Sequence, residues 1–392
     1  MTTSEQEHIS PRMPAVHLPQ GPYDASSPPQ PSELLYDPEF PTPKPNQEQY
    51  LLKIQDAALC RGELAWPEVL SDLRYPHPPI PAHDISGIVL STPTVDERSA
   101  AGPRFKVGDE VFALLAFDRD GGAADCTLAE EHELSFKPQN ISFKEAASIP
   151  LSSLTAWQAF FQHGNLKYVA DKRGYFNGAD TEPIIDGADN KLDGDIKQME
   201  PQEQPIRVLI TNASGGVGVQ ALQLLRSRTL FGDQKFWICG TCSSRNASFV
   251  KDQLHANEVL DYTVQPNISE AFVANGWQPV DIVLDCIGGL ALKQCHSPSV
   301  VRDGGLVLSI AHPIVTAWGN LGIQERQLSS KFFIVQPNGK QLEKIAILVE
   351  QGEVRGFVDA VFDLHQAKAA MELVESKRVR GKVVLRVNCY TS

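Results

Sequence analysis

The sequence lacks any apolar run of about 18 residues, the minimum that a membrane-spanning helix needs, and its longest apolar runs have the length of strands. We therefore expect no membrane-spanning segment. Residues 1–30 are polar and proline-rich, without the apolar core of a secretory signal. They also lack the arginine-rich, acid-poor character of a transit peptide, so we expect a cytoplasmic protein.

An excess of positive charge is also missing. The chain has 35 Lys and Arg against 48 Asp and Glu, which gives a formal net charge of -13 at pH 7. The phosphate backbone of a nucleic acid would on average be repelled by this charge. We therefore expect no nucleic-acid partner.

The seven cysteines are scattered, and an odd number cannot pair completely. Only Cys239 and Cys242 have the C-x-x-C spacing of redox and zinc motifs. They lie at the apolar run 236–241, which indicates a buried strand. We therefore interpret them as small buried side chains, with a redox pair as the alternative.

Composition divides the chain into segments. Residues 1–32 are rich in Pro, Ser and Gln and predict a disordered arm. Residues 171–204 are dominated by Asp, Gly, Glu, Asn and Pro and predict an acidic surface insertion, either a passive loop or a partner contact. The 392 residues exceed the usual size of one core, and an apolar fraction of 42% is enough for two domains.

The part of the chain before the insertion contains short strand-like runs. They begin at Gln49, Asp84 and Val107 and are broken by Pro and Gly, which favours a small antiparallel or barrel-like module. A helical pattern follows from Phe143 to Phe161.

After the insertion, strands and helices alternate. The expected strands are Ile206–Asn212, Phe236–Thr241, Glu258–Asp261, Asp281–Cys286 and Gly305–Ile310. The expected helices are Val217–Arg228, Arg245–Leu254, Ile268–Ala274 and Leu290–His296, with a later helix at His365–Ser376. This alternation predicts an α/β fold with a parallel sheet wrapped by helices.

The sharpest motif is a glycine-rich loop between a strand and a helix. The apolar strand runs directly into Ala213-Ser214-Gly215-Gly216-Val217-Gly218, which opens an amphipathic helix. Gly215 would let the backbone approach a pyrophosphate, and Gly218 would let the helix pack close to the strand. Free amides and the positive end of the helix dipole would bind the phosphates. We therefore predict a dinucleotide site, with a purely structural turn as the alternative.

The end of the second strand indicates which dinucleotide binds. An NAD site usually places Asp or Glu about 20 residues after the loop, whereas this strand ends in Ser243, Ser244 and Arg245. Two hydroxyl groups and a permanent cation suit a 2′-phosphate. We predict NADPH as the cofactor; the alternative is a polar loop that caps the next helix.

A series of motifs resembles the medium-chain dehydrogenase/reductase superfamily, in its zinc-independent quinone oxidoreductase branch. The motifs are Pro81–Val89, Phe105–Ala113, Gly121–Cys126, Ala146–Trp157, Asn212–Gly218, Leu284–Gly289 and Arg380–Leu385. The likeness runs from about Leu34 to Val387, outside the insertion. It implies a Rossmann doubly wound parallel sheet, residues 158–355, inserted into a GroES-like β-barrel catalytic domain, residues 33–157 and 356–392. It also implies an active site in the cleft between the two domains.

The same resemblance implies further residues around the cofactor. They are Tyr262 at the adenosine phosphate, Phe333 and Val335 beside the nicotinamide, Lys382 near the phosphates, and Ile287 and Ile310 after the fourth and fifth strands of the sheet.

Zinc alcohol dehydrogenases of the superfamily use a Cys, a His followed by Glu, and a second Cys. Cys60 and His83 match two of these positions and Asp84 follows the His, but the third position, near Leu151, offers no good ligand. A catalytic zinc needs three protein ligands. The four close cysteines of a structural zinc site are also missing. We therefore expect no metal and interpret His83 as a hydrogen-bonded residue of the cleft.

Three residues are candidates for work on a small-molecule substrate. The cofactor supplies the hydride, while the protein must stabilise an oxyanion and deliver a proton. Tyr75, before Pro76, resembles the Tyr-Pro of enoyl reductases, although its spacing from Glu63 is longer than in that pattern. Arg61 and Glu63 match positions that line the substrate cleft of this family. The alternatives are a packed or surface tyrosine and two paired surface charges, with Glu63 serving only to fix its loop.

The function that we expect is an NADPH-dependent reductase of quinones or α,β-unsaturated carbonyls. Two alternatives remain open: an enoyl reductase of carrier-tethered intermediates, and a protein that binds NADPH without turnover. Members of this branch are often dimers paired through their Rossmann sheets. A homodimer is therefore a further candidate, with Leu306–Ala311 as its seam by analogy.

Overall fold

The structure is a computed structural model that describes residues 9–21, 23, 27–66, 77–94, 102–164, 166–171, 204–313 and 321–388. The chain folds into two compact units, each of which is described by itself. The first contains residues up to Leu151, Pro337–Ile347 and the residues from Gly356 on, and the second contains Ser152–Gln336 and Leu348–Arg355. Tyr75 and residues 172–203 of the acidic insertion lie outside the described residues. The cleft that the resemblance implies stays a prediction.

The second unit is built on a parallel sheet that has six strands among the described residues. They are β8 (Ile206–Ile210), β9 (Phe236–Cys242), β10 (Glu258–Asp261), β11 (Val280–Asp285), β12 (Val301–Ser309) and β13 (Ser329–Phe332). Their order is β10-β9-β8-β11-β12-β13, and all neighbours in it are parallel. The order reverses at β8, which is the topology of the Rossmann fold. The five strands expected from the sequence are confirmed, whereas β13 was not predicted.

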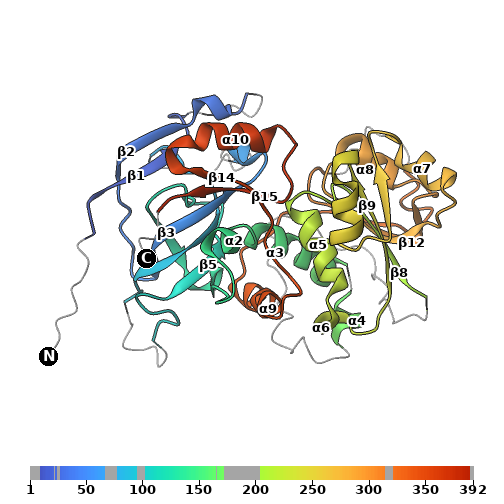
Figure 1. The fold of residues 1–392 in the computed structure, drawn as a ribbon, viewed down its shortest axis with the longest axis horizontal. Coiled ribbons are helices and arrows are strands. Elements are labelled where there is room, and N and C mark those ends of the chain that lie inside the picture. The colour runs from blue at the N-terminus through green and yellow to red at the C-terminus, as the bar shows by residue number, and fades with distance from the viewer. Residues whose placement is uncertain are drawn as a thin grey trace. The chain divides into compact units, whose positions relative to one another are not determined.

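Helices surround this sheet. They are α3 (Pro150–Gln158), η4 (Ala159–His163), α4 (Lys167–Asp171), α5 (Gly216–Arg226), α6 (Arg228–Phe231), η6 (Ser244–Asn246), η7 (Phe249–Gln253), α7 (Ile268–Ala274) and α8 (Gly289–Cys295). One core cluster joins Leu209, Val283 and Val307 of the strands to Phe272 of α7 and Leu292 of α8. No residue of α5 belongs to this cluster, and Figure 1 shows α5 well apart from α7. The helix predicted over 245–254 is confirmed as a continuous helical stretch that runs from η6 through residues 247–248 into η7, with 3₁₀ geometry at its start and π geometry at its end.

The first unit contains a sheet that is seven-stranded within the described residues. Its strands are β3 (Gln49–Leu59), β4 (Asp84–Ser91), β5 (Glu110–Leu114), β6 (Cys126–Glu130), β7 (Leu134–Phe136), β14 (Val358–Asp363) and β15 (Lys382–Arg386). The long strand β3 pairs antiparallel with β4, and also with β6 in its first half and β15 in its second half. Strands from both ends of the chain therefore build one domain, the GroES-like domain into which the Rossmann unit is inserted (Figure 1).

Helices of the first unit fix the ends of this sheet. They are η1 (Pro31–Glu33), η2 (Glu63–Ala65), η3 (Glu131–Glu133), α2 (Phe143–Ala147), the first part of α9 (Gly339–Glu350), η9 (Leu364–Gln366) and α10 (Ala367–Glu375). Ser142 and Glu145 form a capping box that starts α2. α10 buries Ala370 and Met371 in the core that β3 also fills. Within the part of the chain that the structure describes, no helix is long and apolar enough to cross a bilayer.

The expectation of a disordered arm over residues 1–32 is wrong for part of that range. Residues Arg12–His17 form β1, which pairs antiparallel with β2 (Leu35–Pro41). Met13 and Val16 are buried in the core of the first unit, and the Val16 N–H donates to the Ala123 oxygen at 2.8 Å. The Pro- and Ser-rich composition gave no local signal for this short strand, because β1 is stabilised by contacts with β2 and with Ala123. Residues 1–8, 22 and 24–26 lie outside the described residues.

Three further details differ from the sequence expectations. The first boundary between the units follows Leu151 rather than residue 157. The segment Pro337–Ile347 belongs to the first unit, because a Cβ atom at Gly339 would lie 2.9 Å from the carbonyl carbon of Leu134 and the backbones must therefore pack closely. Most of the seam proposed at Leu306–Ala311, namely Leu306–Ser309, lies on β12, which β11 and β13 cover on both edges, so β12 offers no free edge for pairing.

Candidate functional site

The glycine-rich loop runs from β8 into α5. Gly215 is the N-cap residue of α5, and no side chain caps the helix there. The backbone N–H groups of Gly216 and Val217 in the first turn therefore lack intrahelical acceptors and can bind an anion. A Cβ atom at Gly218 would lie 2.6 Å from Cα of Ala213, so glycine is what allows α5 to start this close to the loop.

The loop is held in place by β9. The N–H of Ala213 donates to the Thr241 oxygen at 2.8 Å, and the N–H of Asn212 donates to Thr241 Oγ1 at 3.1 Å. Ser214 is buried, and its Oγ accepts a hydrogen bond from Asn246 Nδ2 at 3.0 Å. The Ser214 side chain therefore positions the loop. All of these contacts are made by the protein itself.

The residues expected at the adenosine phosphate gather where β9 and β10 end. Ser243 is half-buried, and Ser244 and Arg245 are exposed. The N–H of Tyr262 donates to the Cys242 oxygen at 3.1 Å, which joins the ends of the two strands, and the Tyr262 side chain is exposed. The structure thus brings all four sequence-predicted residues to one edge of the sheet.

A carboxylate that the sequence analysis did not consider lies at the same edge. Asp261, the last residue of β10, accepts a hydrogen bond from Ser244 Oγ at 2.5 Å. It also accepts from the N–H of Thr263 at 2.9 Å and from its Oγ1 at 2.6 Å. Burial alone would raise the pKa of Asp261, but the hydrogen bonds from Ser244 and Thr263 outweigh it and lower the pKa. Asp261 is therefore ionised at neutral pH beside Ser244.

Asp285 joins the carboxyl ends of three neighbouring strands. Its fully buried carboxylate accepts from Thr211 Oγ1 at 3.0 Å and from Ser309 Oγ at 2.9 Å. Its carbonyl oxygen accepts from the N–H of Ile310 at 3.0 Å. Ile287 is exposed and Ile310 is half-buried. Both residues expected at the cofactor thus lie on loops that Asp285 fixes.

Phe333 and Val335, expected beside the nicotinamide, lie just after β13 and are buried. The Phe333 ring lies 4.4 Å from the ring of His163, centroid to centroid. Gln158 of α3 donates from Nε2 to the Gln336 oxygen at 2.7 Å and accepts from the Gln336 N–H at 2.9 Å. This pair of hydrogen bonds fixes the segment that carries both residues.

In the first unit, Lys382 occupies a position that the sequence analysis did not anticipate. Its Nζ lies 2.8 Å from Asp84 Oδ2, and both side chains are buried. Asp84 Oδ1 also accepts from the N–H of Leu151 at 2.5 Å. Burial lowers the pKa of Lys382, but the charge and hydrogen bond of Asp84, together with the charges of Cys60 and Glu63, outweigh burial and raise the pKa, so the ammonium is charged. Its approach to a cofactor phosphate stays a prediction.

Glu63 and Arg61 differ sharply in their surroundings. Glu63 is buried, and one of its carboxylate oxygens accepts from the N–H of Cys60 at 3.1 Å. Burial raises the pKa of Glu63 to about 8, against the opposing charge of Lys382. Arg61 is an exposed residue whose Nε lies 3.8 Å from a Glu375 oxygen. Glu63 therefore fixes its loop and keeps its proton at neutral pH, whereas Arg61 is a paired surface charge.

His83 is a buried neutral imidazole. Its Nε2 lies 3.1 Å from the Arg119 main-chain oxygen, and since a carbonyl only accepts, Nε2 carries the proton. Burial lowers the pKa of His83 to about 4. Its Nδ1 is buried without a hydrogen-bond partner among the described residues. The rings of Trp66 and Phe117 each lie 5.5 Å from the imidazole, centroid to centroid.

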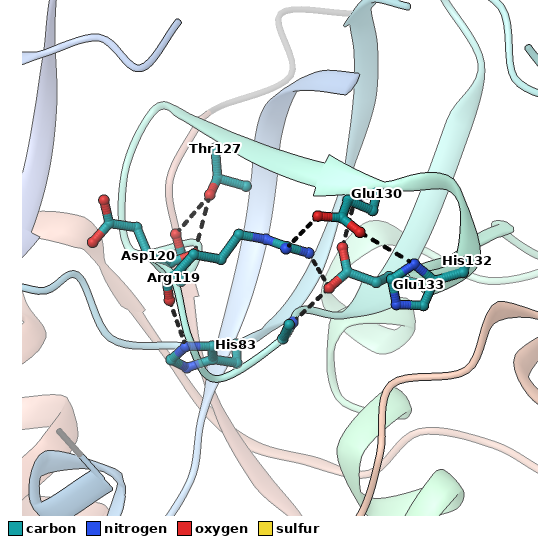
Figure 2. Close-up of polar contacts among 9 residues, drawn as sticks. His83, Arg119, Asp120, Thr127, Glu130, His132 and Glu133 are labelled. Carbon is teal, nitrogen blue, oxygen red and sulfur yellow. Dashed lines mark hydrogen bonds and ion pairs between the residues drawn. The ribbon is translucent and has the colours of Figure 1, made fainter. Parts of the chain in front are cut away.

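Arg119, which holds His83, is itself fixed by carboxylates. Figure 2 shows its side chain reaching Glu130 and Glu133 while its main-chain oxygen faces His83. The Glu133 carboxylate is fully buried and also accepts from the N–H of Ala116 at 2.6 Å. The orientation of His83 thus depends on a network of side chains around it.

The residues at the superfamily's catalytic zinc position do not fit a zinc ion. The Nε2 atom of His83 is protonated and engaged, and the Asp84 carboxylate is paired with the Lys382 ammonium. The third ligand position, near Leu151, offers no side chain that coordinates zinc, whereas a catalytic zinc needs three protein ligands. No group of three His, Cys, Asp or Glu side chains in the described part of the chain could hold a metal ion.

Sequence reasoning missed Asp261, Asp285 and the Asp84–Lys382 pair. Asp285 belongs to a motif that was recognised, and an Asp at the end of an apolar strand was a usable signal for it. The contacts of Asp261 and Lys382 depend on which strands lie side by side, and no local pattern reveals them.

Comparisons with known proteins agree on one family. Residues 254–385 match the family described as zinc-binding dehydrogenase. A protein of Arthroderma benhamiae, named as a probable mitochondrial zinc-binding oxidoreductase, is 35% identical over 350 residues, covering 88% of this chain and 91% of the relative. A chloroplastic quinone-oxidoreductase homolog of Spinacia oleracea is 27% identical over 361 residues, covering 90% of this chain and 94% of the relative.

Solved structures show the same fold. The quinone oxidoreductase from Coxiella burnetii superposes with a TM-score of 0.72 at 24% sequence identity, over 96% of this chain and 100% of that one. The observed strand topology and the likeness to this solved structure both indicate a Rossmann unit inserted into a GroES-like unit. With the relative that is 35% identical over most of its length, these findings show that the chain belongs to the medium-chain dehydrogenase/reductase superfamily of oxidoreductases, in its quinone oxidoreductase branch.

Proposed function

We propose that this protein is an NADPH-dependent, zinc-independent reductase that transfers hydride to a quinone or an α,β-unsaturated carbonyl. The observation that carries the proposal is the edge of the Rossmann sheet where the uncapped start of α5 and the residues Ser243, Ser244 and Arg245 lie. An anion-binding helix start and a hydroxyl-rich, cationic loop are what a phosphorylated dinucleotide requires.

The loop and α5 would bind the pyrophosphate. The N–H groups of Gly216, Val217 and Gly218 lie in the first turn, where they have no acceptor within the helix. Gly215 adds no side chain above them. Because Thr241 and Asn246 hold this loop in its conformation, little ordering would be needed on binding.

The adenosine phosphate would bind at the ends of β9 and β10. Arg245 would supply a permanent charge, and Ser243 and Ser244 would donate from their hydroxyl groups. The exposed ring of Tyr262 would complete this part of the site.

The nicotinamide, when bound, would supply the hydride. The chain would then have to supply a proton to the reduced substrate. Glu63 keeps its proton at neutral pH because burial raises its pKa to about 8, so it would serve as a proton source, and Tyr75 stays a candidate donor. Arg61, whose guanidinium does not give up a proton, would only line the substrate cleft. Two observations support a quinone or enone as the substrate. Relatives of this chain are named as quinone oxidoreductases, and the residues at the superfamily's catalytic zinc position do not fit a zinc ion.

A direct titration tests this function. Purified protein is titrated with NADPH and with NADH, and turnover is then followed as NADPH oxidation with a panel of quinones and enones. Tighter binding of NADPH with turnover of at least one acceptor supports the proposal. Binding without turnover favours a carrier-tethered substrate or a non-catalytic role, and no binding of either nucleotide overturns the assignment.

Three companion measurements test the remaining parts. Elemental analysis of the active protein should find less zinc than one ion per chain, and activity that depends on stoichiometric zinc would contradict the proposal. Sedimentation tests the homodimer. The cytoplasmic location stays a prediction, since the relatives from A. benhamiae and S. oleracea bear organelle names; fractionation of the cells that make the protein would decide it.

A further inference from the structure

The adenosine end of the site contains a negative charge as well as a positive one. Asp261 pairs in register with Cys242 across β10 and β9, which places its side chain beside the start of the 243–245 loop. Its Oδ2 lies 2.5 Å from Ser244 Oγ, and its Oδ1 lies 2.6 Å from Thr263 Oγ1. These contacts fix the carboxylate next to a residue that would bind the 2′-phosphate.

The hydrogen-bond arrangement is unfavourable for a phosphate. A serine hydroxyl has one proton to donate, and that of Ser244 is directed at Asp261. To bind a phosphate oxygen, Ser244 would have to turn its proton away from the carboxylate. The phosphate itself would then lie near a like charge, and a nearby like charge disfavours the ionised form.

A ribose hydroxyl faces the opposite situation. The 2′-OH of NADH carries a proton that a carboxylate accepts, which is the usual reason for an acidic residue at the adenosine end of an NAD site. The same Asp261 would therefore assist NADH and oppose NADPH, while Arg245 would do the reverse.

We propose that Asp261 is a cofactor-selectivity residue that weakens binding of the 2′-phosphate and so narrows the preference of this enzyme for NADPH over NADH. This inference rests on the proposed function, because it takes Ser243, Ser244 and Arg245 as the residues around the 2′-position. On this proposal, the preference for NADPH or NADH depends on the balance between the positive charge of Arg245 and the negative charge of Asp261 at the same edge of the sheet.

The test uses the full-length protein and two fragments of the cofactor. The probes are 2′,5′-ADP, which carries the 2′-phosphate, and 5′-AMP, which lacks it; their dissociation constants are measured by calorimetry, together with those of NADPH and NADH. Asp261→Asn keeps the shape of the side chain and its capacity to accept from Thr263. It should bind 2′,5′-ADP and NADPH roughly 3- to 10-fold more tightly, the effect of removing one repulsive surface charge. Binding of 5′-AMP and NADH should stay the same or weaken.

The matched control is Asp252→Asn in η7. Asp252 is an exposed aspartate of the same unit that likewise accepts from a serine, with Ser248 Oγ at 2.7 Å. Asp252→Asn changes the net charge by the same amount but lies away from the ends of β9 and β10. The affinities of this variant for the two fragments and the two cofactors should therefore match those of the wild type. A second variant, Asp261→Ser, should shift the affinities in the same direction as Asp261→Asn, and circular dichroism checks that both are folded.

The outcomes separate the two proposals. If the wild type binds NADPH but Asp261→Asn leaves 2′,5′-ADP affinity unchanged or lowers it, the selectivity role is overturned and the proposed function stands. If the wild type binds only NADH but Asp261→Asn gains affinity for 2′,5′-ADP, the NADPH assignment fails and the role of Asp261 is supported. An equal gain in Asp252→Asn would also overturn the inference, because the effect would then be one of net charge.

Discussion

The ammonium of Lys382 lies 2.8 Å from a carboxylate oxygen of Asp84, and both side chains are buried in the first unit. The pair connects the first residue of β15 with the first residue of β4. Removing one partner of a buried ion pair strongly lowers the free energy of unfolding, because the remaining charge is left buried and unpaired. Replacing both partners by neutral groups of similar size often leaves the free energy of unfolding nearly unchanged.

The pair should therefore show strong coupling. Lys382→Met should lower the free energy of unfolding by about 3 to 5 kcal/mol, because it leaves the Asp84 charge buried and unpaired. Adding Asp84→Asn should recover part of that loss. Urea denaturation measures both variants, and Lys251→Met, which removes an exposed ion pair with Glu258, is the control expected to cost about 1 kcal/mol or less. A double variant no more stable than Lys382→Met would contradict the coupling.

Glu63 should make the protein less stable as the pH rises. Its folded pKa, raised to about 8 by burial, exceeds the ordinary value of 4.5, so the folded state binds more protons and the free energy of unfolding falls between these two values. Glu63→Gln removes this dependence. Relative to the wild type, the variant should gain about 3 kcal/mol between pH 6 and pH 9.

Urea denaturation across this pH range measures the effect. The exposed control Glu48→Gln should keep the pH dependence of the wild type. Parallel pH profiles for the wild type and Glu63→Gln would show that Glu63 ionises normally in the folded protein.

Arg245 should discriminate between the two nicotinamide cofactors. Arg245→Ala removes a charge-assisted contact to the 2′-phosphate, so NADPH affinity should fall about 10- to 100-fold while NADH affinity changes little. Fluorescence titration of both cofactors measures the ratio. Arg228→Ala, an exposed arginine of α6, should leave both affinities intact, and an equal loss for both cofactors in Arg245→Ala would disprove the phosphate role.

Substitutions of Gly215 and Gly218 in the cofactor loop should have different effects, one on cofactor binding and the other on stability. A Cβ atom at Gly218 would meet the backbone of Ala213 at 2.6 Å, whereas at Gly215 it would meet the side chain of Asn212, which can move. Gly218→Ala should therefore cost about 1 to 3 kcal/mol of stability. Gly215→Val should remain folded and lose NADPH binding, because its side chain covers the helix start.

Thermal denaturation and cofactor titration separate these effects. Gly102→Ala is the control, since its Cβ would have no neighbour within 4 Å. A Gly215→Val protein that still binds NADPH at wild-type affinity would refute the loop as the pyrophosphate site.

The Rossmann unit could be predicted from local sequence for a physical reason. Parallel strands buried on both faces are nearly continuous apolar runs, and β8, β9 and β11 are such runs apart from Arg207 near the start of β8 and Asp281 near the start of β11. The Gly215–Gly218 loop needs glycine at fixed positions because backbones approach there, so its spacing is visible without a structure. β13 escaped prediction because its four residues are only half-buried and mostly polar.

The sequence by itself determined the α/β alternation, the dinucleotide loop and the family, since each depends on residues that are neighbours along the chain. Only the tertiary structure decided that β1 is ordered, that Asp261 lies against Ser244, and that Lys382 pairs with Asp84 across 298 positions of the chain. Those contacts arise where the fold brings together residues that are apart in the sequence, as with β15 and β4, which lie on either side of β3. Burial then sets the charge states of Glu63 and His83, which no local pattern of residues encodes.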